Sequence, residues 1–139
     1  MPSATVRLVE GMQFVATSES GHAVVMDTTE DIGGHDTGPR PMELVLMALG
    51  GCTGMDVVSI LRKMQVQFTR FEMKVEGERA AEHPKYFTKI RVLYRIWGDV
   101  PEEKLKRAID LSLEKYCSVS HSLKPKAEIS YAYQINPPS

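Results

Sequence analysis

The sequence has few cysteines, few aromatic residues and no excess of charge of one sign. Among its 139 residues there are two cysteines, and 17 Lys and Arg residues nearly balance 18 Asp and Glu residues. Two cysteines are too few for the disulfide framework of a small secreted protein, so we expect a reducing, cytoplasmic location. The balanced charge provides no general attraction to nucleic acid or to anionic lipid, and we expect neither as a partner.

Long hydrophobic runs and familiar cofactor motifs are also missing. The longest apolar stretch, Leu44–Gly51, is far shorter than the ~20 residues that span a bilayer. The N-terminus lacks the basic and apolar regions of a signal peptide, so we expect no signal peptide, and we expect no membrane as a partner. Glycine-rich phosphate-binding loops and the HExxH motif are absent from the sequence, and we expect no cofactor and no resident metal.

What the sequence does contain predicts one α+β domain, 1–139, with the element order βββ-α-ββ-α-β and antiparallel sheets. A helix over Pro41–Lys63 is apolar on all sides over its first half, which is typical of a buried central helix. A second helix is expected from Asp99 to Tyr116. Period-two alternation and turn residues predict strands at Thr5–Val9, Gln13–Thr17, His22–Asp27, Phe68–Arg79, Tyr86–Trp97 and Ala127–Ile135.

The order of these elements suggests how the chain is organised. An N-terminal β-meander (4–27) is followed by a crossover loop (28–40) and an α/β body (41–136). Three short strands are too small to be stable alone, and a long loop often crosses to a partner. We therefore expect an intertwined homodimer.

The two cysteines are the main candidates for chemistry. Cys52 follows Gly50 and Gly51 inside the first helix, where each glycine costs roughly 1 kcal/mol relative to alanine, so another group is expected to approach closely. Cys117 ends the second helix, and Ser118 or Ser120 can cap a further short helical turn that lowers the pKa of the thiol. The two thiols can form a peroxidatic and resolving pair, can bind a metal together with His121, or can be ordinary core residues.

Three charged residues accompany Cys52. Asp56 lies four residues later, on the same helical face. There it can accept a hydrogen bond from a partner arginine, can raise the pKa of the thiol if it is unpaired, or can serve in a cap or a dimer salt bridge. Glu43 lies nine residues earlier, about half a turn around a helix of ~3.6 residues per turn, and meets the thiol only if the first turn unwinds. Arg40, held between two prolines, is a stiffly placed cation that can face a substrate or a carboxylate.

The segment Gly38–Cys52, with its Pro-Arg-Pro-Met-Glu-Leu opening and Gly-Gly-Cys end, resembles the helix motif of the OsmC/Ohr family, the osmotically inducible and organic hydroperoxide resistance proteins. Tyr116-Cys117-Ser118-Val119 is similar to the family's second cysteine, and the motif is most like the YhfA-like branch. The resemblance implies an intertwined homodimer that reduces small organic hydroperoxides. Cys52 would become a sulfenic acid, Cys117 would resolve it as a disulfide, and an external dithiol would reduce that disulfide.

The sequence departs from the family pattern at the accessory residues. The family's activating arginine has no counterpart in the turn Val9–Gln13, and Met42 occupies the position of its glutamate. Arg40, Glu43 and Asp56 are therefore the candidates for activating the thiols. We expect four side chains to bind the hydrocarbon part of the substrate, namely Met42, Met47, Met55 and Tyr116. A non-catalytic module for a hydrophobic or thiol ligand, and a thiol redox sensor, remain alternatives.

Overall fold

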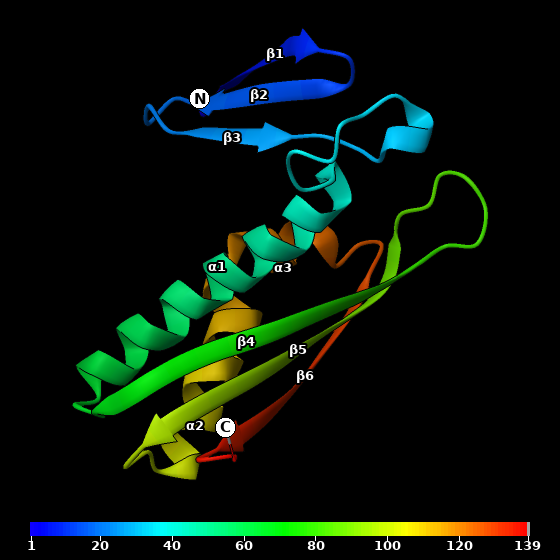
Figure 1. Cartoon of the computed structure of the whole chain (residues 1–139). Coiled ribbons are helices and arrows are strands. Elements are labelled where there is room, and N and C mark those ends of the chain that lie inside the picture. The colour runs from blue at the N-terminus through cyan, green and yellow to red at the C-terminus, as the bar shows by residue number, and fades with distance from the viewer. Residues whose placement is uncertain (139) are drawn as a thin grey trace. The chain divides into compact units, whose positions relative to one another are not determined.

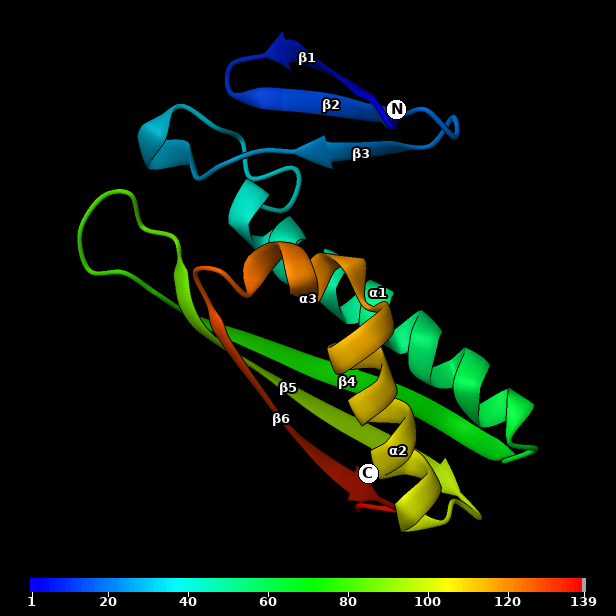
Figure 2. The same ribbon diagram turned by 180° about the vertical axis from the view of Figure 1, so that it is seen from behind.

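The computed structural model describes residues 1–138 and divides the chain into two compact units, Met1–Val45 and Leu46–Ser139. Each unit contains its own three-stranded sheet. Figures 1 and 2 show the ribbon from two opposite sides.

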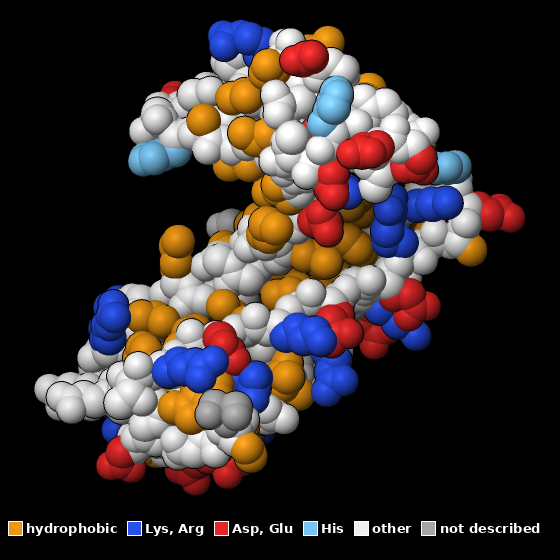
Figure 3. Space-filling view, viewed as in Figure 1, with side chains coloured by type: hydrophobic (Ala, Val, Ile, Leu, Met, Phe, Trp, Pro, Cys, Tyr) orange, Lys and Arg blue, Asp and Glu red, His pale blue; other side chains and the backbone are white. Residues whose placement is uncertain are grey.

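The first unit contains the predicted meander. Strands β1 (Ala4–Glu10), β2 (Gln13–Ser18) and β3 (Ala23–Met26) pair antiparallel in this order, followed by a short 3₁₀ turn, η1 (Glu30–Ile32). Every residue of β1 is exposed within the chain, and Val6 and Leu8 each keep 54% of their surface accessible. Hydrophobic side chains are visible on the surface of this sheet in Figure 3.

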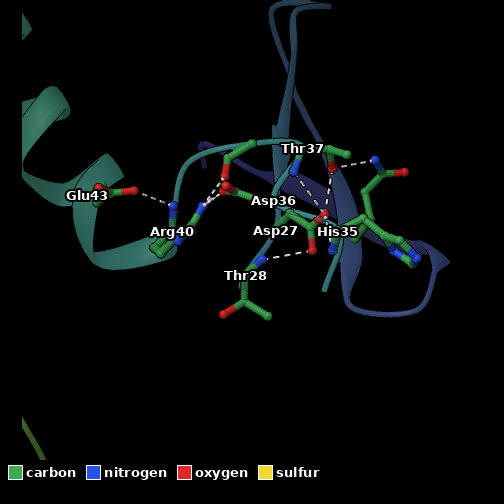
Figure 4. A network of polar contacts seen from close by, with 9 residues as sticks. Asp27, Thr28, His35, Asp36, Thr37, Arg40 and Glu43 are labelled. Carbon is green, nitrogen blue, oxygen red and sulfur yellow. Dashed lines mark hydrogen bonds and ion pairs between the residues drawn. The ribbon is translucent and has the colours of Figure 1, made fainter. Parts of the chain in front are cut away.

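A buried carboxylate orders the segment after β3, which the sequence predicted as a crossover loop. Asp27 accepts hydrogen bonds from the backbone N–H groups of Thr28 (2.8 Å), His35 (3.2 Å) and Thr37 (3.2 Å), and from the Thr37 hydroxyl at 2.6 Å (Figure 4). These bonds lower the pKa of Asp27 to about 2, with the Thr37 hydroxyl as the largest cause and burial opposing it. The loop therefore has a defined conformation.

The second unit is built on a sheet whose central strand is β5 (Phe87–Gly98). Strand β4 (Phe68–Arg79) pairs with it antiparallel, as predicted. Strand β6 (Glu128–Ile135) pairs with it in parallel, so the prediction of purely antiparallel sheets is wrong for this pair. A parallel pair requires a long crossover connection, and the helices between β5 and β6 provide it.

The crossover contains three helical segments, whereas the sequence predicted one helix from Asp99 to Tyr116 and a further short turn after Cys117. Helix α2 (Glu102–Leu111) is followed by a π-helical turn, η2 (Ser112–Tyr116), and by the short helix α3 (Ser118–Leu123). The N–H of Cys117 donates to the carbonyl oxygen of Ser112 at 2.7 Å, which closes the wider turn. Such π turns are rare in proteins, and those that occur often lie at functional sites.

Helix α1 runs over Pro41–Lys63, the range predicted from sequence. Its residues Leu49, Val57 and Leu61 are fully buried, whereas Met47 and Met55 on other faces are 56% and 76% exposed. The helix expected to be buried on all sides is therefore buried on one side within the chain.

The core of the second unit lies between the helices and one face of its sheet. Tyr94 of β5 contacts Thr53 of α1, and its register partner Tyr133 of β6 contacts Glu102 of α2, so both helices pack on the same sheet face. Fully buried apolar residues fill this layer: Leu49, Val57, Leu61, Val92, Tyr94, Ile96, Leu105 and Ile109. By length and composition alone α1 could also cross a membrane, with a mean hydropathy of 1.9, a property that core helices of soluble proteins share.

Candidate functional site

The structure brings together two sulfur atoms and a carboxylate. Cys52 and Asp56 lie one turn apart on α1, and Cys117 lies between η2 and α3. The Sγ atoms of both cysteines and a carboxylate oxygen of Asp56 are all within 4.8 Å of one another. Both cysteines are free thiols; Cys52 is partly buried and Cys117 is fully buried. Three of the residues proposed from sequence thus form one cluster.

Local backbone geometry explains the position of Cys117. The π turn ends at this residue, which has extended backbone angles (φ −73°, ψ 100°) and forms the N-cap of α3. Its thiol accepts the N–H of Ser120 at 3.4 Å, and the Ser120 hydroxyl donates to the Cys117 carbonyl at 2.9 Å. The short helical turn predicted from sequence is confirmed, but its cap is the cysteine and not one of the serines.

The surroundings of Cys117 favour its protonated form. Burial raises the pKa of the Cys117 thiol and the nearby Cys52 raises it further, whereas the hydrogen bonds of Ser120 lower it. The helix-start effect that the sequence predicted is therefore present but is outweighed by burial. Because Cys52 is also the less buried residue of the two, the two thiols are not equivalent.

A chain of hydroxyl groups leads from Asp56 into the core. Its carboxylate accepts the Ser112 hydroxyl at 2.9 Å, Ser112 contacts Thr53 at 2.8 Å, and Thr53 contacts the Tyr94 hydroxyl at 2.7 Å. Because the Ser112 proton points to Asp56, the Thr53 hydroxyl is left to donate to Ser112 and the Tyr94 hydroxyl to donate to Thr53. Burial raises the pKa of Tyr94 far above its ordinary value, which keeps its hydroxyl a donor.

Sequence reasoning did not find this hydroxyl chain. Ser112 was detectable in principle, because it lies three residues after Ile109 on the apolar stripe of the predicted second helix. An arginine was one of the partners considered for Asp56, but among residues 1–138 no ion pair involves this carboxylate. Ser112 takes that place.

Arg40 and Glu43 belong to the first unit and have partners there (Figure 4). The Arg40 guanidinium pairs with Asp36 at 2.6 Å and donates to the Gly38 carbonyl at 3.0 Å. Glu43 accepts the backbone N–H of Arg40 at 2.8 Å, a contact that caps the start of α1. Helix α1 is continuous from Pro41, so the unwinding of its first turn is not observed.

Of the hollows in the described part of the second unit, three that adjoin α1 bear on the predicted substrate residues. The largest, of about 730 Å³, is lined by Met55, Phe71 and Met73, with Arg62 and Lys63 at its margin. A second, of about 380 Å³, includes Met47. A third, of about 400 Å³, includes both Asp56 and Tyr116 and therefore borders the thiol cluster. Met42 lies in the first unit, where it is partly buried. The substrate-binding roles of these residues stay predictions.

The chemistry of the cluster also fits a metal ion. Thiolates and carboxylates are zinc ligands, and the three candidate ligand atoms lie close enough to share one cation. The sequence suggested His121 as a third ligand beside the cysteines. In the structure its Nδ1 contacts the Cys117 carbonyl oxygen at 3.0 Å, and Asp56 is the residue that joins the two sulfurs.

Comparisons with known proteins agree with the sequence motif. A family model described as OsmC-like protein matches residues 34–132. Protein YhfA of Escherichia coli strain K12 is 42% identical over 133 residues, which covers 95% of this chain and 96% of the relative.

Two solved structures illustrate how widely the fold is shared. A hypothetical protein from Aquifex aeolicus has a TM-score of 0.82 and 30% identity, covering 99% of this chain and 98% of its own. An organic hydroperoxide resistance protein OsmC from Legionella pneumophila has a TM-score of 0.72 and 12% identity, covering 96% of both chains, and supports the fold alone. The recognition of the family and of its fold from sequence is thus confirmed, and the chain belongs to the OsmC-like protein family.

Proposed function

We propose that this protein is a thiol-dependent peroxidase that reduces organic hydroperoxides through Cys52 and Cys117. The observation that carries the proposal is the pairing of two free thiols, one partly accessible and one buried, whose sulfur atoms lie within 4.8 Å. Solved relatives named as organic hydroperoxide resistance proteins support the substrate class.

In the first step Cys52 attacks the terminal oxygen of the hydroperoxide. The O–O bond breaks, the sulfur is oxidised to a sulfenic acid, and the alcohol leaves after taking up a proton. The partial exposure of Cys52 supports its assignment as the attacking sulfur, since the peroxide must reach it from solvent.

In the second step the Cys117 sulfur attacks the sulfenic acid. A disulfide forms between the two residues and water leaves. An S–S bond is ~2.0 Å long, so the sulfurs need to approach by less than about 3 Å from their present separation. An external dithiol then restores both thiols by exchange and is itself oxidised to a disulfide.

Asp56 is proposed to position the reacting groups. Its carboxylate is oriented by the Ser112 hydroxyl and lies within reach of both sulfurs, where it can accept a hydrogen bond from a protonated thiol. The hollow that includes Asp56 and Tyr116 is the proposed approach for the peroxide. Roles for Arg40 and Glu43 in this reaction are also proposals, in which these residues substitute for the family's arginine and glutamate without matching their positions in the sequence.

We also propose that the active form is a homodimer located in the cytoplasm. The strand β1 and the side chains of Met47 and Met55 expose apolar surface within the single chain, and such surface commonly marks an interface. Sedimentation of the purified chain gives a direct answer, and a monomer at micromolar concentration would contradict this part of the proposal.

A second function, binding of an apolar ligand without turnover, is favoured by one observation. The hollow of about 730 Å³ lined by Met55, Phe71 and Met73 is large enough for a small lipid-like molecule. Consumption of cumene hydroperoxide with a dithiol present separates the two functions, because a binding module consumes none.

The peroxidase is tested by trapping its intermediates. A Cys117→Ser variant should stop at the Cys52 sulfenic acid, which dimedone labels and mass spectrometry locates. A Cys52→Ser variant should neither react with dimedone after peroxide treatment nor turn over. Labelling at Cys117 in place of Cys52 would reverse the two assignments, and full turnover of the Cys52→Ser variant would exclude the mechanism.

A further inference from the structure

The cluster of Cys52, Asp56 and Cys117 has a feature that peroxide reduction does not require. Three groups that become anions on deprotonation point to one place from two separate elements, α1 and the junction of η2 with α3. Among residues 1–138 no ion pair involves Asp56. A bound cation would balance the charge of these three groups once the thiols are deprotonated.

The distances suit a small, thiophilic cation. Zinc binds sulfur at about 2.3 Å and carboxylate oxygen at about 2.0 Å, so tetrahedral ligands lie roughly 3.5–3.8 Å apart. The three candidate atoms are already within 4.8 Å of one another, and side-chain rotations that move them about 1 Å closer give the separations of zinc ligands. Three protein ligands leave a fourth position for water.

The surroundings supply the outer contacts that metal ligands usually have. The Ser112 hydroxyl donates to the Asp56 carboxylate, and the hydroxyls of Thr53 and Tyr94 hold Ser112 in place. The Ser120 N–H donates to the Cys117 sulfur. Such outer hydrogen bonds orient ligands and increase metal affinity.

We propose that Cys52, Asp56 and Cys117 form a binding site for a thiophilic divalent cation such as Zn²⁺ or Cd²⁺. On binding, two metal–sulfur bonds and one metal–oxygen bond form, and the two thiol protons pass to solvent. No electron is transferred. The bound cation withdraws both sulfurs from oxidation, so it acts as a reversible inhibitor; this second part rests on the proposed peroxidase function.

Cadmium provides the most direct test of binding. The reduced full-length chain is titrated with Cd²⁺ in a buffer free of chelators and of peroxide, and the ultraviolet sulfur-to-cadmium charge-transfer band is recorded. We expect saturation at one cation per chain. The Cys52→Ser and Cys117→Ser variants should each lose a large part of the band, and a band of wild-type intensity in either variant overturns the proposal.

Two further variants separate the carboxylate from general charge effects. Asp56→Asn keeps the side-chain size but removes the charge. Loss of an outer hydrogen-bond partner of a metal ligand already lowers metal affinity by about 10-fold to 100-fold, so we expect the loss of this ligand to lower the affinity for Cd²⁺ by at least as much. Glu114→Gln removes an exposed carboxylate near Cys117 and serves as the matched control. Equal affinities of the two variants would overturn the role of Asp56. Circular dichroism of each variant verifies that it is folded.

The two proposals can fail separately. Binding is measured without peroxide, and peroxide consumption is measured after treatment with a chelator. Saturable binding in a chain that never consumes peroxide would exclude the peroxidase and retain the metal site. Turnover that Zn²⁺ leaves unchanged at saturating concentration would exclude the inhibition, whereas we expect near-complete loss that the chelator reverses.

Discussion

The two units of this chain hold comparable sheets in different ways. The sheet β1-β2-β3 leaves apolar side chains such as Val6 and Leu8 exposed, and the loop that follows it is ordered by the polar contacts of Asp27. The sheet β4-β5-β6 is covered on one face by α1 and α2, with Tyr94 and Leu61 fully buried. Both thiols lie in the second unit, which has the packed core. Packing of α1 and the segment after α2 on that core brings the two sulfurs within 4.8 Å of each other.

The largest expected effect contrasts one leucine from each unit. Leu61→Ala removes a fully buried side chain from α1 and should lower the free energy of unfolding by about 2–5 kcal/mol. Leu8→Ala removes one that is 54% exposed in the chain, and for the isolated chain we expect a change within about 0.5 kcal/mol.

Urea denaturation at several protein concentrations measures both leucine variants. If the loss in free energy of unfolding caused by Leu8→Ala depends on protein concentration, a second chain covers β1, and the contrast between the two units holds for the single chain. A loss for Leu8→Ala equal to that for Leu61→Ala at every concentration would contradict the contrast.

A smaller effect is expected for the buried hydroxyl chain. Thr53→Val preserves the shape of the side chain but leaves the hydroxyls of Tyr94 and Ser112 without their shared partner, and should cost about 1–3 kcal/mol. Thr69→Val removes an exposed hydroxyl and is the control, with no measurable cost expected. Thermal unfolding compares the two, and similar melting temperatures would show that the chain of hydroxyls contributes nothing.

These contacts also show which parts of the molecule sequence reasoning can reach. The bounds of α1 were predictable because Pro41 and Glu43 mark its start and the apolar pattern extends to Arg62 and Lys63. The parallel pairing of β6 was not predictable, because the alternation of apolar and polar residues in Ala127–Ile135 is the same for either strand direction. Only the length of the β5-to-β6 connection carried that information.

The site divides in the same way. The shared face of Cys52 and Asp56 follows from a spacing of four residues in a helix. The approach of Cys117 depends on the π turn at Ser112, for which the sequence has no recognised signal. The contact between Ser112 and Asp56 depends on the packing of one helix against another, which local patterns do not specify.

The smallest effect concerns acid stability of the first unit. The pKa of Asp27 is about 2 when folded and is ordinarily 3.8, so the ionised carboxylate favours the folded loop. Its contribution is fully present above about pH 4 and is lost as the pH falls through about 2. We expect the amide proton of Thr37 to shift with a midpoint near the lower value in an NMR titration.

Two variants test the assignment of that titration. Asp27→Asn should abolish the shift of the Thr37 amide and loosen the loop, as judged by faster amide exchange at His35 and Thr37. Asp31→Asn removes an exposed carboxylate of η1 and should leave the titration unchanged. A midpoint near the ordinary value of 3.8 in the unmodified chain would contradict the structural role given to Asp27.

The most direct test of the central proposal is a count of free thiols in the reduced protein after one equivalent of cumene hydroperoxide, with hydrogen peroxide in parallel. We expect both thiols to disappear together, a mass loss of two hydrogen atoms and a Cys52–Cys117 disulfide in the peptide map, formed faster with the organic peroxide. Two unreacted thiols, or oxidation of Cys52 to higher acids with Cys117 still free, would contradict the pairing of the two sulfurs as a redox couple.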